Sequence, residues 1–111
     1  MNTFNEIGNT RTSKKDEALR ALQSAITLTL QYIENSKTIK CADRNTEYTL
    51  SQAWSDAAIK VRYVSKDLAV RLQAKADYWA DQLEWSKEEV MTKGIDLQKI
   101  REEFRQLIAN P

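Results

Sequence analysis

The stretch VRYVSKDLAV, residues 61–70, decides the fold, because it joins two apolar stripes that share one helical phase. The first stripe consists of Leu50, Ala53, Trp54, Ala57, Val61 and Val64, and the second of Leu68, Leu72, Ala76, Trp79, Leu83 and Val90. Residues 50–92 contain no glycine or proline, so one long helix is possible, but Ser65 and Asp67 are both suitable N-caps. A break there lets one small chain bury both stripes. We therefore expect two helices, with one continuous helix in a dimer as the alternative.

Two further amphipathic segments flank this pair. Before it, apolar residues recur at spacings of three and four, as on one helix face, at Leu19, Leu22, Ile26, Leu30 and Ile33. After it, Gly94 is typical of a helix end and Asp96 of a helix start. Another regular apolar set follows at Leu97, Ile100, Phe104, Leu107 and Ile108. The chain is therefore predicted to be all-α, an antiparallel four-helix bundle with helices at about residues 14–37, 49–64, 66–92 and 96–109.

Composition favours a single helical domain. The 111 residues are 41% hydrophobic and 30% charged, as in a globular domain with one modest core. Two glycines and one proline provide few of the turns that a many-stranded sheet needs. Residues 1–12 are expected to form a flexible leader, and residues 13–111 a single helical-bundle domain. The polar N-terminus and the single Cys41, in a predicted loop at residues 36–49, lead us to expect a cytoplasmic protein.

The residue types present argue against most catalytic chemistry. The chain has no histidine, which removes the commonest general base and the ligands typical of helical di-iron sites. One cysteine without histidine excludes a structural zinc site within one chain. Four carboxylates would follow one another along a helix face, but a line of ligands does not converge on a cation: Asp77, Asp81, Glu84 and Glu88. We therefore expect no catalytic site, no metal and no cofactor.

The aromatic residues of KADYWADQLEW, residues 75–85, suggest a binding surface. On a helical wheel Trp79 lies at the centre of the second stripe, so we expect it in the core, as we do Trp54. Tyr78 and Trp85 lie together on a flank away from that centre. This flank either packs against a neighbouring helix or binds another protein, because tryptophan, tyrosine and arginine are frequent in binding hot spots. The predicted binding residues are Tyr78, Trp85, Arg71, Gln82 and Glu89.

Two other surfaces provide alternatives. The back of the first helix carries Ala25, Leu28 and Tyr32, which either meet an adjacent helix or form a homodimer. A basic group near the start of that helix, joined by two residues of the second, is a candidate for nucleic-acid binding: Arg11, Lys14, Lys15, Arg20, Lys60 and Arg62. A net charge of +1 makes nucleic acid the less favoured partner. The expected function is a non-enzymatic protein–protein interaction or adaptor module that self-associates and does not bind membranes.

Overall fold

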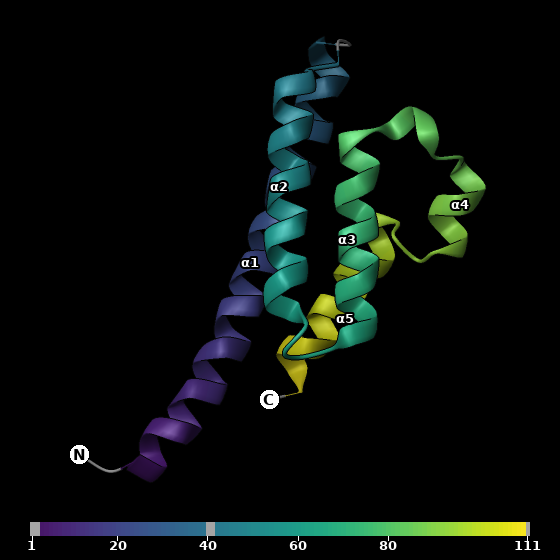
Figure 1. Cartoon of the computed structure of the whole chain (residues 1–111). Coiled ribbons are helices and arrows are strands. Elements are labelled where there is room, and N and C mark those ends of the chain that lie inside the picture. Colours follow the sequence, from purple (N-terminus) through teal and green to yellow (C-terminus); the bar gives the residue numbers. More distant parts are fainter. Residues whose placement is uncertain (1–2, 40–41, 111) are drawn as a thin grey trace.

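The computed structural model describes residues 3–39 and 42–110, with the side chains of residues 13–38 and 42–110. Cys41 and the side chain of Arg11 lie outside the described residues. The elements are α1 (Thr3–Ile39), α2 (Arg44–Val61), α3 (Lys66–Ala80), a short 3-10 helix η1 (Gln82–Glu84), α4 (Lys87–Thr92) and α5 (Leu97–Ala109). Helices α1, α2, α3 and α5 alternate in direction, so the predicted antiparallel four-helix bundle is confirmed (Figure 1).

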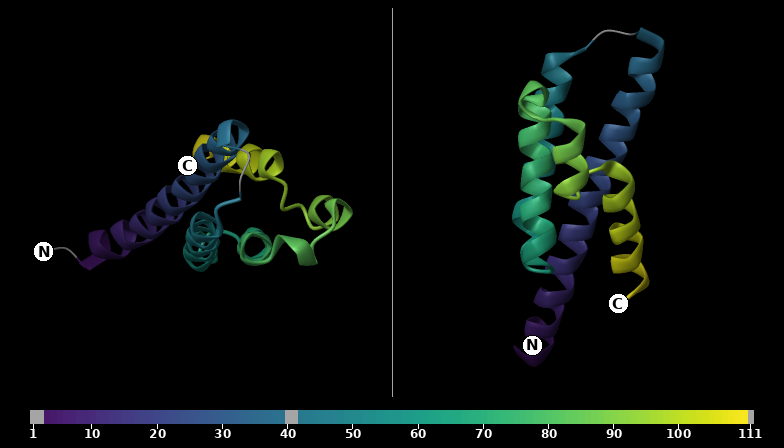
Figure 2. Two further views of the ribbon diagram at one scale, coloured as in Figure 1. Left: turned by 90° about the horizontal axis from the view of Figure 1, so that it is seen from above. Right: turned by 90° about the vertical axis from the view of Figure 1, so that its right-hand side faces the viewer.

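The four helices are not packed equally closely. Helix α2 packs against both α1 and α3, whereas α5 packs against α1. Because α5 has 13 residues and α1 has 37, α5 covers only part of α1 (Figure 2). Residues 81–96, which we call the arch, lead away from the end of α3 and return to α5 beside the bundle (Figures 1 and 2). None of the helices in the described part of the chain is both long and apolar enough to cross a membrane.

The chain breaks between α2 and α3 where the sequence indicated. Helix α2 ends at Val61, and Ser65 caps α3 by accepting a hydrogen bond from the backbone N–H of Leu68 at 3.1 Å. The alternative of one continuous helix is therefore wrong. Trp54 and Trp79 are 0% and 6% exposed, so both tryptophans lie in the core as predicted.

Helices α1 and α2 both begin earlier than predicted. Helix α1 includes residues 3–12, where we expected a flexible leader. That segment contains no proline, and its single glycine weakens a helix by only about 1 kcal/mol, so nothing in it forces the helix to start later. Helix α2 begins at Arg44 and not near residue 49, because Asp43 provides the N-cap: its side chain accepts a backbone hydrogen bond from the first turn.

The predicted helix over residues 66–92 is wrong, because α3 ends at Ala80. Two long-range interactions are formed at that end. Arg44 donates a hydrogen bond to the carbonyl oxygen of Ala80 at 2.6 Å, and so satisfies a carbonyl at the helix end. Gln82 donates from Nε2 to the carboxylate of Glu47 at 2.9 Å, which draws the chain away from the axis of α3.

The early end of α3 moves several side chains out of their predicted places. Leu83, predicted for the core, is 98% exposed in η1, and Val90 is half-buried in α4. The acidic side chains within residues 77–88 are divided among α3, η1 with its N-cap, and α4, so they do not follow one another along a single helix face. In the part of the chain that the structure describes, no three potential metal ligands gather into a site.

The buried face of α1 also differs from the predicted one. Its buried side chains are Ala18, Leu22, Ala25, Ile26 and Thr29. Leu30 and Ile33, which the periodicity placed in the core, are 36% and 39% exposed. The small side chains allow α2 to approach α1 closely, so alanine and threonine occupy this contact. Ala25 is 0% exposed, so its assignment to a self-association surface is wrong.

A buried hydrogen bond joins α1 and α2 at this contact. Trp54 donates from Nε1 to the hydroxyl oxygen of Thr29 at 2.8 Å, and Thr29 donates its own proton to the carbonyl oxygen of Ala25 at 2.7 Å. Trp54 and Thr29 are both fully buried, so water does not reach either group. The indole N–H therefore depends on this one acceptor.

Thr29→Val keeps the shape of the side chain but removes that acceptor. We expect it to lower the free energy of unfolding by about 1–3 kcal/mol, because a buried donor is left unpaired. Thr29→Ser keeps the hydroxyl and should restore part of the loss. Urea unfolding followed by tryptophan fluorescence measures the effect, with the exposed Thr27→Val on the same helix as the control. A Thr29→Val variant as stable as Thr27→Val would show that the hydrogen bond contributes nothing.

Candidate functional site

Four aromatic rings connect α1 to the arch, and we call Tyr32, Trp79, Tyr78 and Trp85 the aromatic row. Tyr32 of α1 lies edge-on to Trp79 of α3, with ring centroids 5.7 Å apart. Tyr78 lies edge-on to Trp79 at 5.2 Å. Trp85 of the arch completes the row at 6.5 Å from Tyr78, again edge-on. Edge-to-face contacts at these distances are favourable beyond simple burial, so the row links three elements into one surface.

A buried carboxylate binds one end of the row, at Tyr32, and also binds Gln82 at the start of the arch. Glu47 of α2 is 5% exposed and accepts hydrogen bonds from the hydroxyl of Tyr32 at 2.7 Å and from Nε2 of Gln82 at 2.9 Å. Arg44 supplies the counter-charge, with Nη1 at 2.5 Å from Oε1 of Glu47. Burial, and then the charge of Glu47, raise the pKa of Tyr78, and both also act to raise that of Tyr32. Both phenols therefore stay protonated at neutral pH.

A pocket of about 460 Å³ opens between the end of α3 and the arch, and we call it the arch pocket. Tyr78, Trp85 and Val90 contribute to its walls. Leu83 and Met91 also line it, although they are 98% and 65% exposed. The pocket thus combines half-buried aromatic walls with an exposed apolar rim.

The arch pocket brings together three of the predicted binding residues. Tyr78, Gln82 and Trp85 all line it. Trp85 reaches Tyr78 because the chain turns after α3, and not through the helical spacing that the prediction assumed. Glu89 is exposed, but its carboxylate accepts a hydrogen bond from the backbone N–H of Ser86 in the capping box of α4.

Arg71 does not belong to this surface and instead holds α5 and the arch to α3. Its side chain is 14% exposed and binds both carboxylate oxygens of Glu103 on α5, with 2.8 Å between Nη1 and Oε1. Nε and Nη2 of Arg71 also donate to the carbonyl oxygen of Gly94 at 3.2 and 2.8 Å. Gly94 has a φ of 67°, a backbone conformation that is strained for residues with a side chain. The guanidinium of Arg71 occupies the space next to Gly94.

The sequence analysis missed a buried lysine behind the aromatic row. Lys75 is 4% exposed, and its Nζ lies 5.2 Å from the ring centroid of Tyr78 and 5.9 Å from those of Trp54 and Trp79. No hydrogen bond or ion pair to Lys75 is formed within the described residues. Burial lowers the pKa of Lys75 from 10.5 to about 8, although the negative charge of Asp96 acts to raise it. The sequence signal for its burial was the apolar residues that lie three and four positions from Lys75, on the same side of the helix.

Lys75→Met should stabilise the protein at pH 7. The folded state binds the Lys75 proton less tightly than the unfolded state, since folding lowers the pKa from 10.5 to about 8. Below pH 8 the full cost of burying the charged Lys75 is present. This cost is at most about 3 kcal/mol, since the surrounding aromatic rings attract the ammonium group and offset part of it. The cost falls as the pH rises from 8 towards 10.5, where both states lose the proton.

Urea unfolding of the wild type and Lys75→Met between pH 7 and pH 10 measures this difference. It should be largest at pH 7 and shrink as the pH rises. The exposed Lys66→Met, on the same helix, controls for a general effect of charge. A Lys75→Met variant that is less stable at pH 7, or a difference independent of pH, would show that the buried charge carries no cost.

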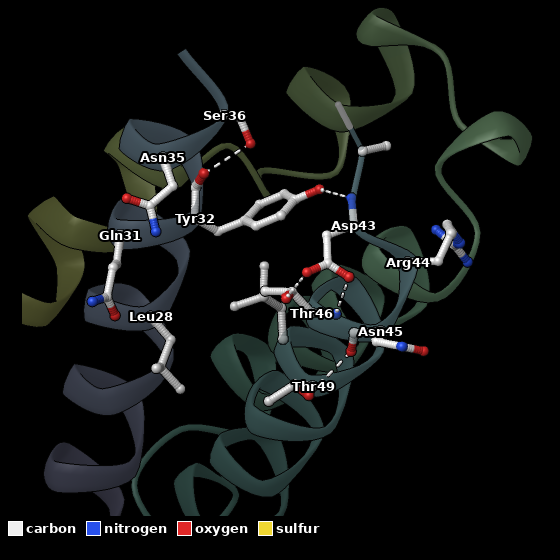
Figure 3. A pocket seen from close by; sticks show the side chains of 12 residues that line it. Leu28, Gln31, Tyr32, Asn35, Ser36, Asp43, Arg44, Asn45, Thr46 and Thr49 are labelled. Atoms are coloured by element: carbon white, nitrogen blue, oxygen red, sulfur yellow. Dashed lines mark hydrogen bonds between the residues drawn. The ribbon is translucent and has the colours of Figure 1, made fainter. Parts of the chain in front are cut away.

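Two of the predicted self-association residues, Leu28 and Tyr32, line a second pocket, which we call the elbow pocket. It has a volume of about 640 Å³ and lies between the C-terminal part of α1 and the start of α2 (Figure 3). Leu28 and Tyr32 line it from α1, and Asp43 and Thr46 line it from the α2 side. Two of the three residues predicted for a dimer interface therefore border a cavity within one chain.

The structure brings together part of the predicted basic group. Lys14 of α1 lies over the ring of Tyr63 at 4.4 Å, and Arg62 lies over the same ring at 5.2 Å. Lys15 and Lys60 are engaged within the fold: the first donates to a carbonyl oxygen at the end of α5, and the second pairs with a carboxylate of α2. A small basic and aromatic cluster thus remains exposed where α1 passes the end of α2.

No known family matches this chain. No family model, curated protein or solved structure is significantly similar to it.

Proposed function

We propose that this protein is a non-enzymatic helical interaction module that binds another protein at the arch pocket. The observation that supports this most directly is the exposure of Leu83 and Met91, 98% and 65%, at the edge of a pocket lined by Tyr78 and Trp85. Large aromatic side chains in such pockets dominate the energetics of many interfaces. A partner that covers the rim removes this apolar surface from water and strengthens binding.

The arch also has a charge that favours one kind of partner. It carries four exposed acidic and two exposed basic side chains, at residues 81, 84, 88 and 89 and at residues 87 and 93. Charges around the rim of an interface direct association and select partners of opposite sign. A partner that inserts an apolar side chain into the arch pocket and surrounds it with basic residues fits this surface best.

Leu83→Glu should disrupt this interaction without unfolding the protein. A photo-reactive phenylalanine analogue in place of Met91 would report the partner as a cross-linked adduct in the host cell. We expect Leu83→Glu to reduce the yield of that adduct at least tenfold, since a charge replaces an apolar contact at the rim. Its thermal stability should be unchanged, because the side chain is 98% exposed.

Ile59→Glu is the matched control, because Ile59 is 54% exposed on α2 and does not line the arch pocket. It should leave the adduct unchanged. Light scattering on the purified chain then shows whether the partner is a second copy, as self-association predicts. An adduct that survives Leu83→Glu, or one that Ile59→Glu reduces equally, would contradict a specific surface at the arch.

A second candidate function is accessory nucleic-acid binding, favoured by the convergence of Lys14 and Arg62 on the exposed ring of Tyr63. Binding of double-stranded DNA should weaken as salt increases, because each phosphate contact releases counterions. The double variant Lys14→Gln with Arg62→Gln should reduce the slope of log K against log salt by about two units. Lys87→Gln on the arch is the control. No binding at low salt would eliminate this candidate.

A further inference from the structure

The elbow pocket has the size of a small-molecule site and largely apolar sides. Its volume of about 640 Å³ falls within the range of roughly 300–1,000 Å³ typical of ligand pockets. Leu28 and the ring of Tyr32 line it from α1, and Leu50 lines it from α2. Figure 3 shows Leu28 and Tyr32 on one side and the start of α2 on the other.

One exposed carboxylate, that of Asp43, lines this pocket, is held by hydrogen bonds, and has no ion-pair partner among the described residues. Asp43 accepts hydrogen bonds from the hydroxyl of Thr46 at 2.6 Å and from the backbone N–H of Thr46 at 3.2 Å. These hydrogen bonds, that of the hydroxyl first, lower the pKa of Asp43, so the carboxylate is ionised at neutral pH. The backbone N–H of Asp43 donates to the hydroxyl of Tyr32 at 3.1 Å, which holds the carboxylate next to the aromatic ring.

The only cationic side chain that borders the pocket within the described residues is directed elsewhere. Arg44 places its guanidinium 2.5 Å from Glu47 and 2.6 Å from the carbonyl oxygen of Ala80, and over the ring of Tyr48. Figure 3 shows Arg44 pointing away from the pocket. The other polar side chains of the α1 wall are neutral: Gln31, Asn35 and Ser36. An anionic ligand would therefore be repelled by Asp43, and a cationic one would be attracted.

We propose that the elbow pocket binds a primary alkylammonium group, with the nitrogen at Asp43 and the aliphatic stem against Leu28 and Tyr32. The charge and the apolar sides are both needed, because a charged hydrogen bond orients the nitrogen while burial of the methylene groups supplies affinity. Free alkyl amines and lysine side chains share this chemistry. The site is separate from the arch pocket, so neither proposal depends on the other.

Nuclear magnetic resonance titration of the full chain with matched probes tests the proposal. The probes are n-hexylamine, n-hexanol, hexanoate and an N-acetyl-lysine amide. We expect hexylamine to shift the amide signals of residues 43–46 with a dissociation constant of about 1 mM or lower. Hexanol should bind at least tenfold more weakly, and hexanoate should not bind. A lysine amide that binds like hexylamine identifies a partner's lysine as the source, whereas hexylamine alone identifies a free amine.

Three variants separate the charge from the cavity. Asp43→Asn keeps the N-cap of α2, because asparagine caps as well as aspartate. It should weaken hexylamine about tenfold and leave hexanol unchanged. Leu28→Trp fills the pocket and should abolish binding of both probes. Leu30→Trp should not, although Leu28 and Leu30 are both 36% exposed on the same helix, because Leu30 does not line the pocket.

Three results would overturn the proposal. Equal binding of hexylamine and hexanol would show that the carboxylate has no role. Unchanged hexylamine binding in Asp43→Asn would show the same for Asp43 itself. Equal effects of Leu28→Trp and Leu30→Trp would place the bound amine outside the elbow pocket.

Discussion

The connected ends of α1, α2 and α3 depend on the hydrogen bonds that the carboxylate of Glu47 accepts. Glu47 is 5% exposed, and a buried carboxylate without donors would cost several kcal/mol. Its donors are Tyr32 of α1, Arg44 of α2 and Gln82 of η1, so these three elements have to meet at one point. This meeting point lies at the end of α3, since Gln82 binds Glu47 just after the chain leaves the helix at Ala80. The arch, and with it the arch pocket, begins at this point.

This explains which parts of the fold were predictable from the sequence. The N-caps at Ser65 and Asp96 depend on contacts within a single turn, and the sequence shows those residues directly. The end of α3 depends on Arg44 and Gln82, whose partners lie 36 and 35 residues away in the chain. No helical period contains that information, so the apolar stripe continued past the true end of the helix.

The candidate site shows the same limit at the level of single residues. Tyr78 and Trp85 were correctly paired, but the wheel placed them on one helix, whereas a turn brings them together. Ala25 was wrongly assigned to the surface, because the buried stripe was identified from large residues such as leucine. Close packing of α1 on α2 instead favours small side chains. Lys75 was overlooked because a hydrophobic pattern assigns every charged residue to the surface. In each case the missing information was the distance to a neighbouring helix.

The polar groups that weaken the core gather beside the aromatic row. Lys75 is buried without an ion pair among the described residues, and Nε1 of Trp79 is buried there without an acceptor. On the opposite side of the same core, Trp54 has its acceptor in Thr29. A core selected for stability alone would satisfy both tryptophans and replace the lysine with an apolar residue of similar shape. Both departures adjoin Tyr78, which lines the arch pocket, although Lys75 also lies 5.9 Å from the ring of Trp54. Since stability is often sacrificed where a protein acts, the position of these groups beside Tyr78 agrees with the proposed binding at the arch pocket.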